Sequence, residues 1–458
     1  MKNTLLFLSA GAALLPLSDA FAAKSATKEK PNILLILCDD LGWGDLSCQW
    51  AKDIRTPNID KLFTGGIRLD NFYAASNVSS PSRAGLLTGR YPSMVGVPGV
   101  IRGGSHTFGY LSPDAVLIPE MLSRAGYRTA HFGKWHLGLQ SPNLPNDRGF
   151  DYYAGFLGDM MNSYYTYARD KTNYMRINYD PVTPTGHATE VFTNWANDYI
   201  RSAAKEKAPF FAYLAYNAPH EPLQPPKEWL EKVRKREPQM SETRSKLVGL
   251  IEHLDDNVGK VIATLEATGQ LNNTLIIFSS DNGGKLLDEA NNGPNRGGKG
   301  EMYEGGIKVP CAFYWKGVIE PRRIVDMVHM CDLFPTLCDL AGVRIDHHVD
   351  GISVLPLLKG EKQDVNHRYV FWDMREVGDY NMQVAVRYDN YKLLRPKLPK
   401  SNALFEFYDL ASDSMEEKPL PMSGGIYDDL KSRADAHLAE GNSIPWREGM
   451  PNPPVYGK

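Results

Sequence analysis

Four long apolar runs in this sequence each end in polar residues, and this pattern restricts the chain to few folds. The runs are "NILLILCDD" (32–40), "YRTAHFGKWH" (127–136), "PFFAYLAYNAPHEP" (209–222) and "NTLIIFSSDNGG" (273–284). Near-continuous apolar runs are typical of the central strands of a parallel sheet, because both faces of such a sheet are buried. Helix-like segments at 117–125, 190–205 and 241–268 lie between the runs. The sequence therefore predicts an α/β fold with a large, doubly wound, mostly parallel sheet flanked by helices.

The polar residues at the ends of these runs should meet at one edge of that sheet. In doubly wound folds, ligands bind beyond the carboxyl ends of the strands. The four runs place seven polar side chains there: Asp39, Asp40, Lys134, His136, His220, Asp281 and Asn282. This edge is the predicted functional site.

The character of the sequence changes after "DGISVLPLLKG" (350–360). The short alternating runs "RYVFWDM", "MQVAVRYDNYKLL" and "ALFEFYDL" predict a small antiparallel sheet, followed by a final helix over 426–440. We expect a boundary near residue 365, with the main α/β domain at 23–365 and a C-terminal α+β subdomain at 366–458.

The first 22 residues have the pattern of a secretory signal peptide. A lysine near the start precedes an apolar run, and the small-residue motif Ala20-Phe21-Ala22 predicts cleavage after Ala22. No other run is apolar for long enough to span a bilayer, so we expect an exported periplasmic or secreted protein that does not cross the membrane.

Composition excludes some partners and says little about others. The 458-residue chain is 42% hydrophobic with a net charge of -3, so no basic excess indicates a nucleic-acid partner. Five cysteines in an exported chain leave at least one unpaired. Their spacing matches no zinc motif, and we expect buried free thiols, with room for one disulfide.

The stretch "NVSSPSRAGLLTGRYP" (77–92) predicts a short helix over 82–88. Pro81 suits the first turn of a helix, and Gly89 suits the left-handed residue that ends one. The free N–H groups of that helix would face the position beside Ser79, where they favour an anion. Arg83 adds a positive charge one turn into the helix. The alternative is an ordinary capped helix on the surface.

The carboxylates at the strand ends are candidates for metal binding. Adjacent charges such as Asp39 and Asp40 repel each other unless a cation neutralises them. Asp281 and Asn282 add hard oxygen ligands from another strand, so the set suits calcium or magnesium. The alternative is that the aspartates cap helices and that "DNGG" forms a turn.

Three further candidates are weak signals when each is taken alone. Lys134 and His136 are two residues apart, so an extended chain would point them to the same side. Lys299 lies in the glycine-dense loop "NRGGKGEMYEGG" (295–306), which could approach a ligand closely. His220 lies in "NAPHEP". Each of these motifs also fits a surface loop.

Taken together, the motifs resemble those of a known enzyme family. In order they are "DD", "SSPSRAGLLTGR", "GKWHLG", "APHEP", "SDNGG" and "GGKGEMYEGG". The chain resembles the formylglycine-dependent (type I, arylsulfatase-like) sulfatases of the alkaline phosphatase superfamily over nearly all of its mature length. The resemblance implies that a maturase oxidises Ser79 to formylglycine, with Pro81 and Arg83 as its recognition signal. One hydroxyl of the hydrated aldehyde would attack sulfur, and the other would later expel sulfate.

The same resemblance implies a role for each candidate residue. One divalent cation, usually calcium in this family, would be held by five side chains: Asp39, Asp40, modified Ser79, Asp281 and Asn282. Arg83 would steady the aldehyde hydrate, while Lys134 and Lys299 would neutralise the sulfuryl group. His136 would take the proton of the second hydroxyl, and His220 would serve the leaving alcohol.

The resemblance leaves the substrate and the state of Ser79 open. A sulfated carbohydrate (a glycosaminoglycan, mucin or algal glycan) or an aryl sulfate is the expected substrate. One alternative is hydrolysis of phosphate monoesters or diesters on the same fold. Another is a catalytically inactive glycan-binding protein in which Ser79 stays unmodified. Ser79 is either native, since some bacterial maturases accept serine, or an engineered replacement of cysteine.

Overall fold

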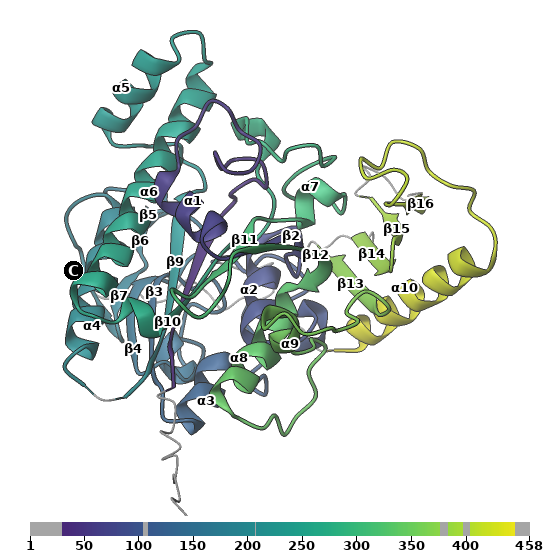
Figure 1. The fold of residues 1–458 in the computed structure, drawn as a ribbon, viewed down its shortest axis with the longest axis horizontal. Coiled ribbons are helices and arrows are strands. Elements are labelled where there is room, and N and C mark those ends of the chain that lie inside the picture. Colours follow the sequence, from purple (N-terminus) through teal and green to yellow (C-terminus); the bar gives the residue numbers. More distant parts are fainter. Residues whose placement is uncertain (1–29, 104–108, 207, 376–382, 397–403, 445–458) are drawn as a thin grey trace, which may run out of the picture. The chain divides into compact units, whose positions relative to one another are not determined.

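The four apolar runs form four adjacent parallel strands at the centre of a ten-stranded sheet (Figure 1). In the computed structural model the described residues are 30–103, 109–206, 208–375, 383–396 and 404–444. The expected signal peptide and its cleavage site after Ala22 lie outside them. In sheet order the strands are β12 (Arg322–His329), β2 (Ile67–Tyr73), β11 (Cys311–Tyr314), β10 (Thr274–Ser280), β1 (Asn32–Asp39), β9 (Phe210–Pro219), β3 (Arg128–Lys134), β4 (Tyr152–Phe156), β7 (Met175–Ile177) and β8 (Asp180–Pro181). A separate two-stranded sheet pairs β5 (Ala168–Arg169) with β6 (Thr172–Asn173).

The predicted fold class is confirmed, and the sheet is mixed rather than wholly parallel. Strand β11 runs antiparallel to both β10 and β2, and β7 runs antiparallel to β4 and β8. Every residue of β1, β9 and β10 is buried, which is why these strands are continuous apolar runs in the sequence. Strand β12 is partly exposed in its first half and buried in its last three residues, so it carries a weaker signal.

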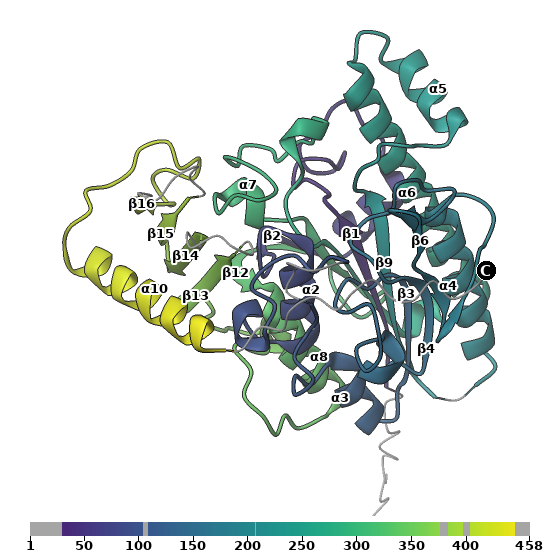
Figure 2. The same cartoon turned by 180° about the vertical axis from the view of Figure 1, so that it is seen from behind.

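Helices cover both faces of the sheet (Figures 1 and 2). The long helices α4 and α6 pack against β9 on one face, and α2, α3 and α8 lie on the other. The helices are α1 (Pro57–Thr64), α2 (Ser79–Thr88), α3 (Ile118–Arg124), α4 (Ala188–Ala203), α5 (Lys227–Arg236), α6 (Glu242–Ala267), α7 (Glu304–Ile307), α8 (Leu333–Ala341), α9 (Leu355–Leu358) and α10 (Gly425–Ser443). None of the helices in the described part of the chain has the length and apolarity that a membrane crossing requires.

The predicted C-terminal sheet is confirmed. It contains β13 (Tyr369–Met374), β14 (Gln383–Tyr388), β15 (Tyr391–Arg395) and β16 (Glu406–Asp409), all antiparallel, and α10 packs against β14. The fully buried Lys392 of β15 pairs with Glu304 of α7 at 2.9 Å and with Glu416 at 2.8 Å. Residues 31–458 make up one compact unit. The domain boundary near residue 365 falls between α9 and β13 and stays a prediction.

All five cysteines are free thiols, and four of them are buried. Burial raises the pKa of Cys38, Cys311 and Cys331 well above the usual value. These groups therefore stay protonated and act as small apolar side chains. The expected buried thiols are present, and the structure contains no disulfide.

Four buried histidines are held neutral by the fold. His131 of β3 is stacked between Tyr213 and Tyr153, with ring centroids 4.6 and 5.1 Å away. Burial, aided by the charge on Arg83, lowers the pKa of His131 to about 3. Burial likewise lowers the pKa of three others: His187 to about 3, His253 to about 4 and His329 to about 4.

These histidines predict a loss of stability in acid. Below a pH of about 6.5 the unfolded chain binds protons that the folded chain excludes, so stability falls as pH falls, by about 1.4 kcal/mol per pH unit and histidine. The variant His131→Gln removes one such contribution. Between pH 7.5 and 5.0 it should lose about 2 kcal/mol less unfolding free energy than the wild type. Urea titrations at both pH values measure this, with exposed His348→Gln as control. Equal losses in all three proteins would contradict the assignment.

Candidate active site

The turn that follows β1 is attached to the end of the neighbouring strand β10. The backbone N–H of Asp281 donates to the carbonyl of Cys38 at 3.1 Å, and the N–H of Asp40 donates to Oδ1 of Asp281 at 3.2 Å. Asp40 has a left-handed backbone with φ +66°. No helix follows Asp39 and Asp40 directly, so the helix-capping alternative is wrong. The parallel register instead brings both carboxylates beside Asp281.

Ser79 is the first residue of α2 and lies over this carboxylate edge. The helix begins three residues earlier than the predicted Ser82, with Val78 as N-cap. Its end is as predicted, because Gly89 is the left-handed residue (φ +66°). Ser79 Oγ donates to Asp39 Oδ1 at 2.9 Å. All ten residues of α2 are buried, so the surface-helix alternative is wrong.

Arg83 lies one turn into α2 and joins the helix to two strand ends. Its side chain has no exposed surface, and its Nη2 and Nε donate to Asp281 Oδ2 at 2.8 and 3.1 Å. Its Nη1 donates to the carbonyl of Lys134 at 3.1 Å. Burial alone would lower the pKa of Arg83, but Asp281 and Asp39 raise it overall. Arg83 is therefore a fixed positive charge beneath the site.

Two lysines neutralise the adjacent aspartates. Lys134 Nζ lies 2.7 Å from Asp39 Oδ2 and 3.5 Å from Ser79 Oγ. Lys299 Nζ lies 2.7 Å from Asp40 Oδ2, and its side chain is only 20% exposed, unlike that of a solvated loop lysine. Burial would raise the pKa of both aspartates, but Lys134 beside Asp39 and Lys299 beside Asp40 hold them below the usual value.

The pKa values of the two lysines shift in opposite directions. Burial lowers the pKa of Lys134. Burial also opposes the charge of Lys299, but the carboxylate of Asp40 outweighs it and raises the pKa of Lys299. Asp281 differs from its neighbours, because burial and the negative charge of Asp39 raise its pKa. Arg83 opposes this shift, since it pairs with Asp281 Oδ2 at 2.8 Å.

His136 is oriented by a backbone carbonyl. Its Nε2 lies 2.7 Å from the carbonyl oxygen of Ile101, which only accepts, so Nε2 carries the proton. The lone pair is then on Nδ1, which is buried and has no hydrogen-bond partner among the described residues. Burial lowers the pKa of His136 well below its usual value, and the charges of Lys134 and Arg83 lower it further. The ring is thus neutral, with a free acceptor nitrogen.

His220 lies on the other side of the aspartates. Its Nδ1 is 2.8 Å from the carbonyl oxygen of Glu221, so Nδ1 carries a proton and Nε2 is the nitrogen left for the site. Nε2 lies 3.6 Å from Asp40 Oδ2. The tyrosine Tyr164 fixes this turn by donating to the carbonyls of Asn217 and His220, each at 2.8 Å.

The oxygen-rich cluster fits a hard divalent cation. Ligand atoms of Asp39, Asp40 and His220 all lie within 4.8 Å of one another. Asn282 Oδ1 lies 3.5 Å from Ser79 Oγ, and Asn282 Nδ2 donates to Asp40 Oδ1 at 2.8 Å. Carboxylate, amide and hydroxyl oxygens suit calcium or magnesium rather than a thiolate-binding metal.

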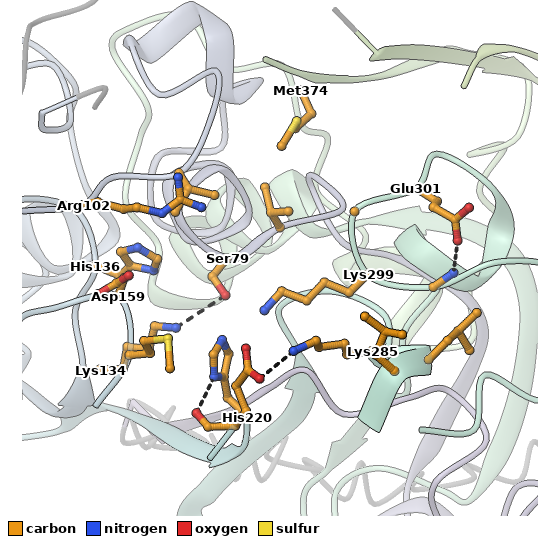
Figure 3. Close-up of a pocket in the computed structure, with 18 of the residues that line it drawn as sticks. Ser79, Arg102, Lys134, His136, Asp159, His220, Lys285, Lys299, Glu301 and Met374 are labelled. Atoms are coloured by element: carbon orange, nitrogen blue, oxygen red, sulfur yellow. Dashed lines mark hydrogen bonds and ion pairs between the residues drawn. The ribbon is translucent and has the colours of Figure 1, made fainter. Parts of the chain in front are cut away.

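Part of this cluster opens onto one pocket of about 500 Å³ (Figure 3). Ser79, Lys134, His136, His220 and Lys299 line it. Its outer wall contains residues that sequence reasoning missed: Arg102, Asp159, Arg169, Glu221, Lys285, Glu301 and Met374. They come from separate loops and from the strands β5 and β13, so no single motif could indicate them.

Comparison with known proteins identifies the family. The sulfatase family model matches residues 31–343. The chain belongs to the sulfatase family. A second model, the C-terminal region of N-sulphoglucosamine sulphohydrolase, matches residues 298–440. This sulfatase is a sulfuric ester hydrolase, and the expected resemblance is confirmed.

Several sulfatases are similar to this one over most of their length. Human N-acetylgalactosamine-6-sulfatase is 32% identical over 373 residues, covering 74% of this chain and 68% of the relative. Human arylsulfatase A is 32% identical over 387 residues, covering 77% and 72%. The crystal structure of Ps i-CgsB, 32% identical, superposes with a TM-score of 0.84 over 92% of this chain and 95% of that one. The same protein is known in complex with k-i-k-neocarrahexaose.

Proposed function

We propose that this sulfatase hydrolyses sulfate esters on a sulfated carbohydrate, with Ser79 converted to formylglycine and a divalent cation, calcium, bound beside it. The observation that carries the proposal is the place of Ser79. Its Oγ lies at the start of α2, 2.9 Å from Asp39 Oδ1 and 3.5 Å from Lys134 Nζ, at the pocket surface. A side chain at that point can meet an anion that both the helix and the lysines attract.

The burial of Ser79 indicates when a maturase would act. Ser79 is 4% exposed, and Arg83 and Pro81 are buried with it. An enzyme that recognises these side chains must therefore reach them before the chain folds. The hydrated aldehyde of formylglycine supplies a nucleophilic hydroxyl and a second hydroxyl for releasing sulfate. Serine lacks that second hydroxyl.

The cation would be held by the oxygen atoms at the strand ends: Asp39, Asp40, Asp281, Asn282 and residue 79. When bound, it supplies positive charge that lowers the pKa of a coordinated hydroxyl and polarises the sulfate oxygens. The protein's own cations share this work. Lys134 and Lys299 approach the pocket from opposite sides, and each can balance charge on a sulfuryl group.

The two histidines are suited to different proton transfers. Nε2 of His136 donates to the carbonyl of Ile101, so Nδ1 carries a lone pair that can accept a proton from a hydroxyl in the pocket. His220 also lines the pocket, and its Nε2 would hydrogen-bond or protonate the oxygen of the leaving alcohol. The backbone carbonyls of Ile101 and Glu221 fix the nitrogen that each ring offers.

The shape and charge of the pocket support a sugar as substrate. Its rim holds ion pairs such as Arg169 with Asp159 (3.2 Å) and Lys285 with Glu221 (2.6 Å). Such pairs present donors and acceptors side by side, which match the hydroxyl groups of a carbohydrate. The relatives named for N-acetylgalactosamine 6-sulfate and seen with a neocarrahexaose support the same class of substrate. The sequence of residues 1–22 supports export to the periplasm.

The conversion of Ser79 to formylglycine can be tested by mass and by activity. Coexpression with a serine-accepting maturase should give a Ser79 peptide lighter by the mass of two hydrogens. Turnover of a sulfated sugar should rise in proportion to the modified fraction. The variant Ser79→Ala, which cannot be modified, should lose activity by several orders of magnitude. Mass spectrometry with a sulfate-release assay measures both. Full activity with unmodified Ser79 would contradict the proposal.

The binding of a cation can be tested by its effect on thermal stability. A cation that binds only the folded state stabilises it by about 2.7 kcal/mol at one hundred times its dissociation constant. Chelation should therefore lower the thermal midpoint, and added calcium should restore it. Asp281→Asn should reduce both the bound metal and this calcium-dependent shift. Asp332→Asn is the matched control, since Asp332 is equally buried and pairs with Arg368. Elemental analysis and calorimetry measure the effects, and an unchanged metal content in Asp281→Asn would contradict the ligand set.

A further inference from the structure

The C-terminal sheet reaches into the site through one buried glutamine. Gln383 is the first residue of β14 and is 2% exposed. Its Nε2 donates to the carbonyl of Gly300 at 3.1 Å, and its Oε1 accepts from Asn77 Nδ2 at 3.3 Å. The N–H of Gly300 donates to the carbonyl of Asn77 at 2.9 Å. The three residues therefore form a closed ring of hydrogen bonds.

This ring joins the two loops that carry Ser79 and Lys299. Asn77 lies two residues before Ser79, and Gly300 directly follows Lys299. On its other side, the N–H of Lys299 donates to the carbonyl of Gly284 at 3.1 Å. The two segments are far apart in sequence, and Ser79 and Lys299 both line the pocket (Figure 3).

Gly300 is suited to this junction by its backbone. Its φ is +86°, and a Cβ added there would meet no atom within 4 Å. Glycine is therefore required for conformation rather than for space. In that conformation its N–H faces Asn77 while its carbonyl faces Gln383.

Neighbouring residues of β13 support the same contact. The indole Nε1 of Trp372 donates to the carbonyl of Ala74 at 2.8 Å, and Met374 lines the pocket. The strands β13 and β14 are thus attached to the segment that leads into α2.

We propose that Gln383 is a positioning residue that sets the separation between residue 79 and Lys299 across the pocket. The inference rests on the proposed function, because it assigns the Ser79–Lys299 pair to the sulfate site. An amide is suited to this position because it provides both donors and an acceptor. Leucine has a similar size and offers neither, while an ionised glutamate keeps only the acceptor.

The test compares Gln383→Leu and Gln383→Glu with the wild type. Both variants leave residues 77–90 intact, so maturation is unaffected, and kcat is expressed per formylglycine measured by mass spectrometry. A catalytic group displaced by about 1 Å costs up to roughly 100-fold in rate. We therefore expect kcat to fall by about 10- to 100-fold in Gln383→Leu and by less in Gln383→Glu. Hydrogen exchange should quicken in peptides covering 75–80 and 297–302 and stay at wild-type rates elsewhere.

The control variant is Tyr369→Phe. It removes a 2.6 Å hydrogen bond from Tyr369 to Asp429 within the same subdomain, and this bond is remote from both loops. Its kcat and its exchange in the two segments should match the wild type. Equal losses in Tyr369→Phe and Gln383→Leu would contradict the positioning role, as would wild-type kcat and exchange in both Gln383 variants.

Two further results have a clear meaning, namely a Gln383→Leu variant that does not fold and a wild-type protein without activity. If Gln383→Leu does not fold, Gln383→Glu alone decides, since it keeps the shape of the side chain and replaces the donor to Gly300 with a carboxylate oxygen. A wild-type protein that releases no sulfate would contradict the proposed function. Hydrogen exchange would still decide the role of Gln383 in that case, because it requires no substrate.

Discussion

The burial of three carboxylates at one edge of the sheet is the constraint on which the rest of the site depends. Asp39, Asp40 and Asp281 are fully or almost fully buried, and unpaired charges in such a place are strongly destabilising. The fold brings one protein cation from each of three segments to this edge: Arg83 from α2, Lys134 from β3 and Lys299 from the glycine-rich loop. The same ion pairs therefore stabilise the fold and bring the residues of the site together.

This charge balance also explains why the site can hold sulfate. The carboxylates pair with Arg83 and the two lysines, while Ser79, Lys134 and Lys299 line the pocket. A divalent cation bound to the carboxylates would release the lysines from full pairing. They could then turn part of their charge toward an anionic substrate. The C-terminal sheet contributes by holding the two loops that carry Ser79 and Lys299, so it is part of the site's construction.

The sequence predicts the strands of the site better than its walls. The four central strands are buried on both faces, which makes them visible as apolar runs, and their order in the fold places the polar ends together. Strand β12 and the start of α2 are harder to predict from the sequence. A half-exposed strand lacks a continuous apolar run, and Ser79 and Ser80 are residue types that are typical of loops. Arg102, Asp159 and Met374 line the pocket through long-range packing, which no local pattern encodes. The contacts of Gln383 with Gly300 and Asn77 likewise cannot be predicted from the sequence, because these residues are far apart along the chain.

The most direct test of the central claim is the choice between sulfate and phosphate esters. A sulfate monoester carries one negative charge and a phosphate monoester close to two, so a site with balanced charge should discriminate between them. The measurement is kcat/KM of the matured, calcium-loaded protein for an aryl sulfate and for the aryl phosphate with the same leaving group. The balanced charge of the site predicts a preference for the sulfate of at least about 100-fold in kcat/KM. An equal or greater kcat/KM for the phosphate would contradict it.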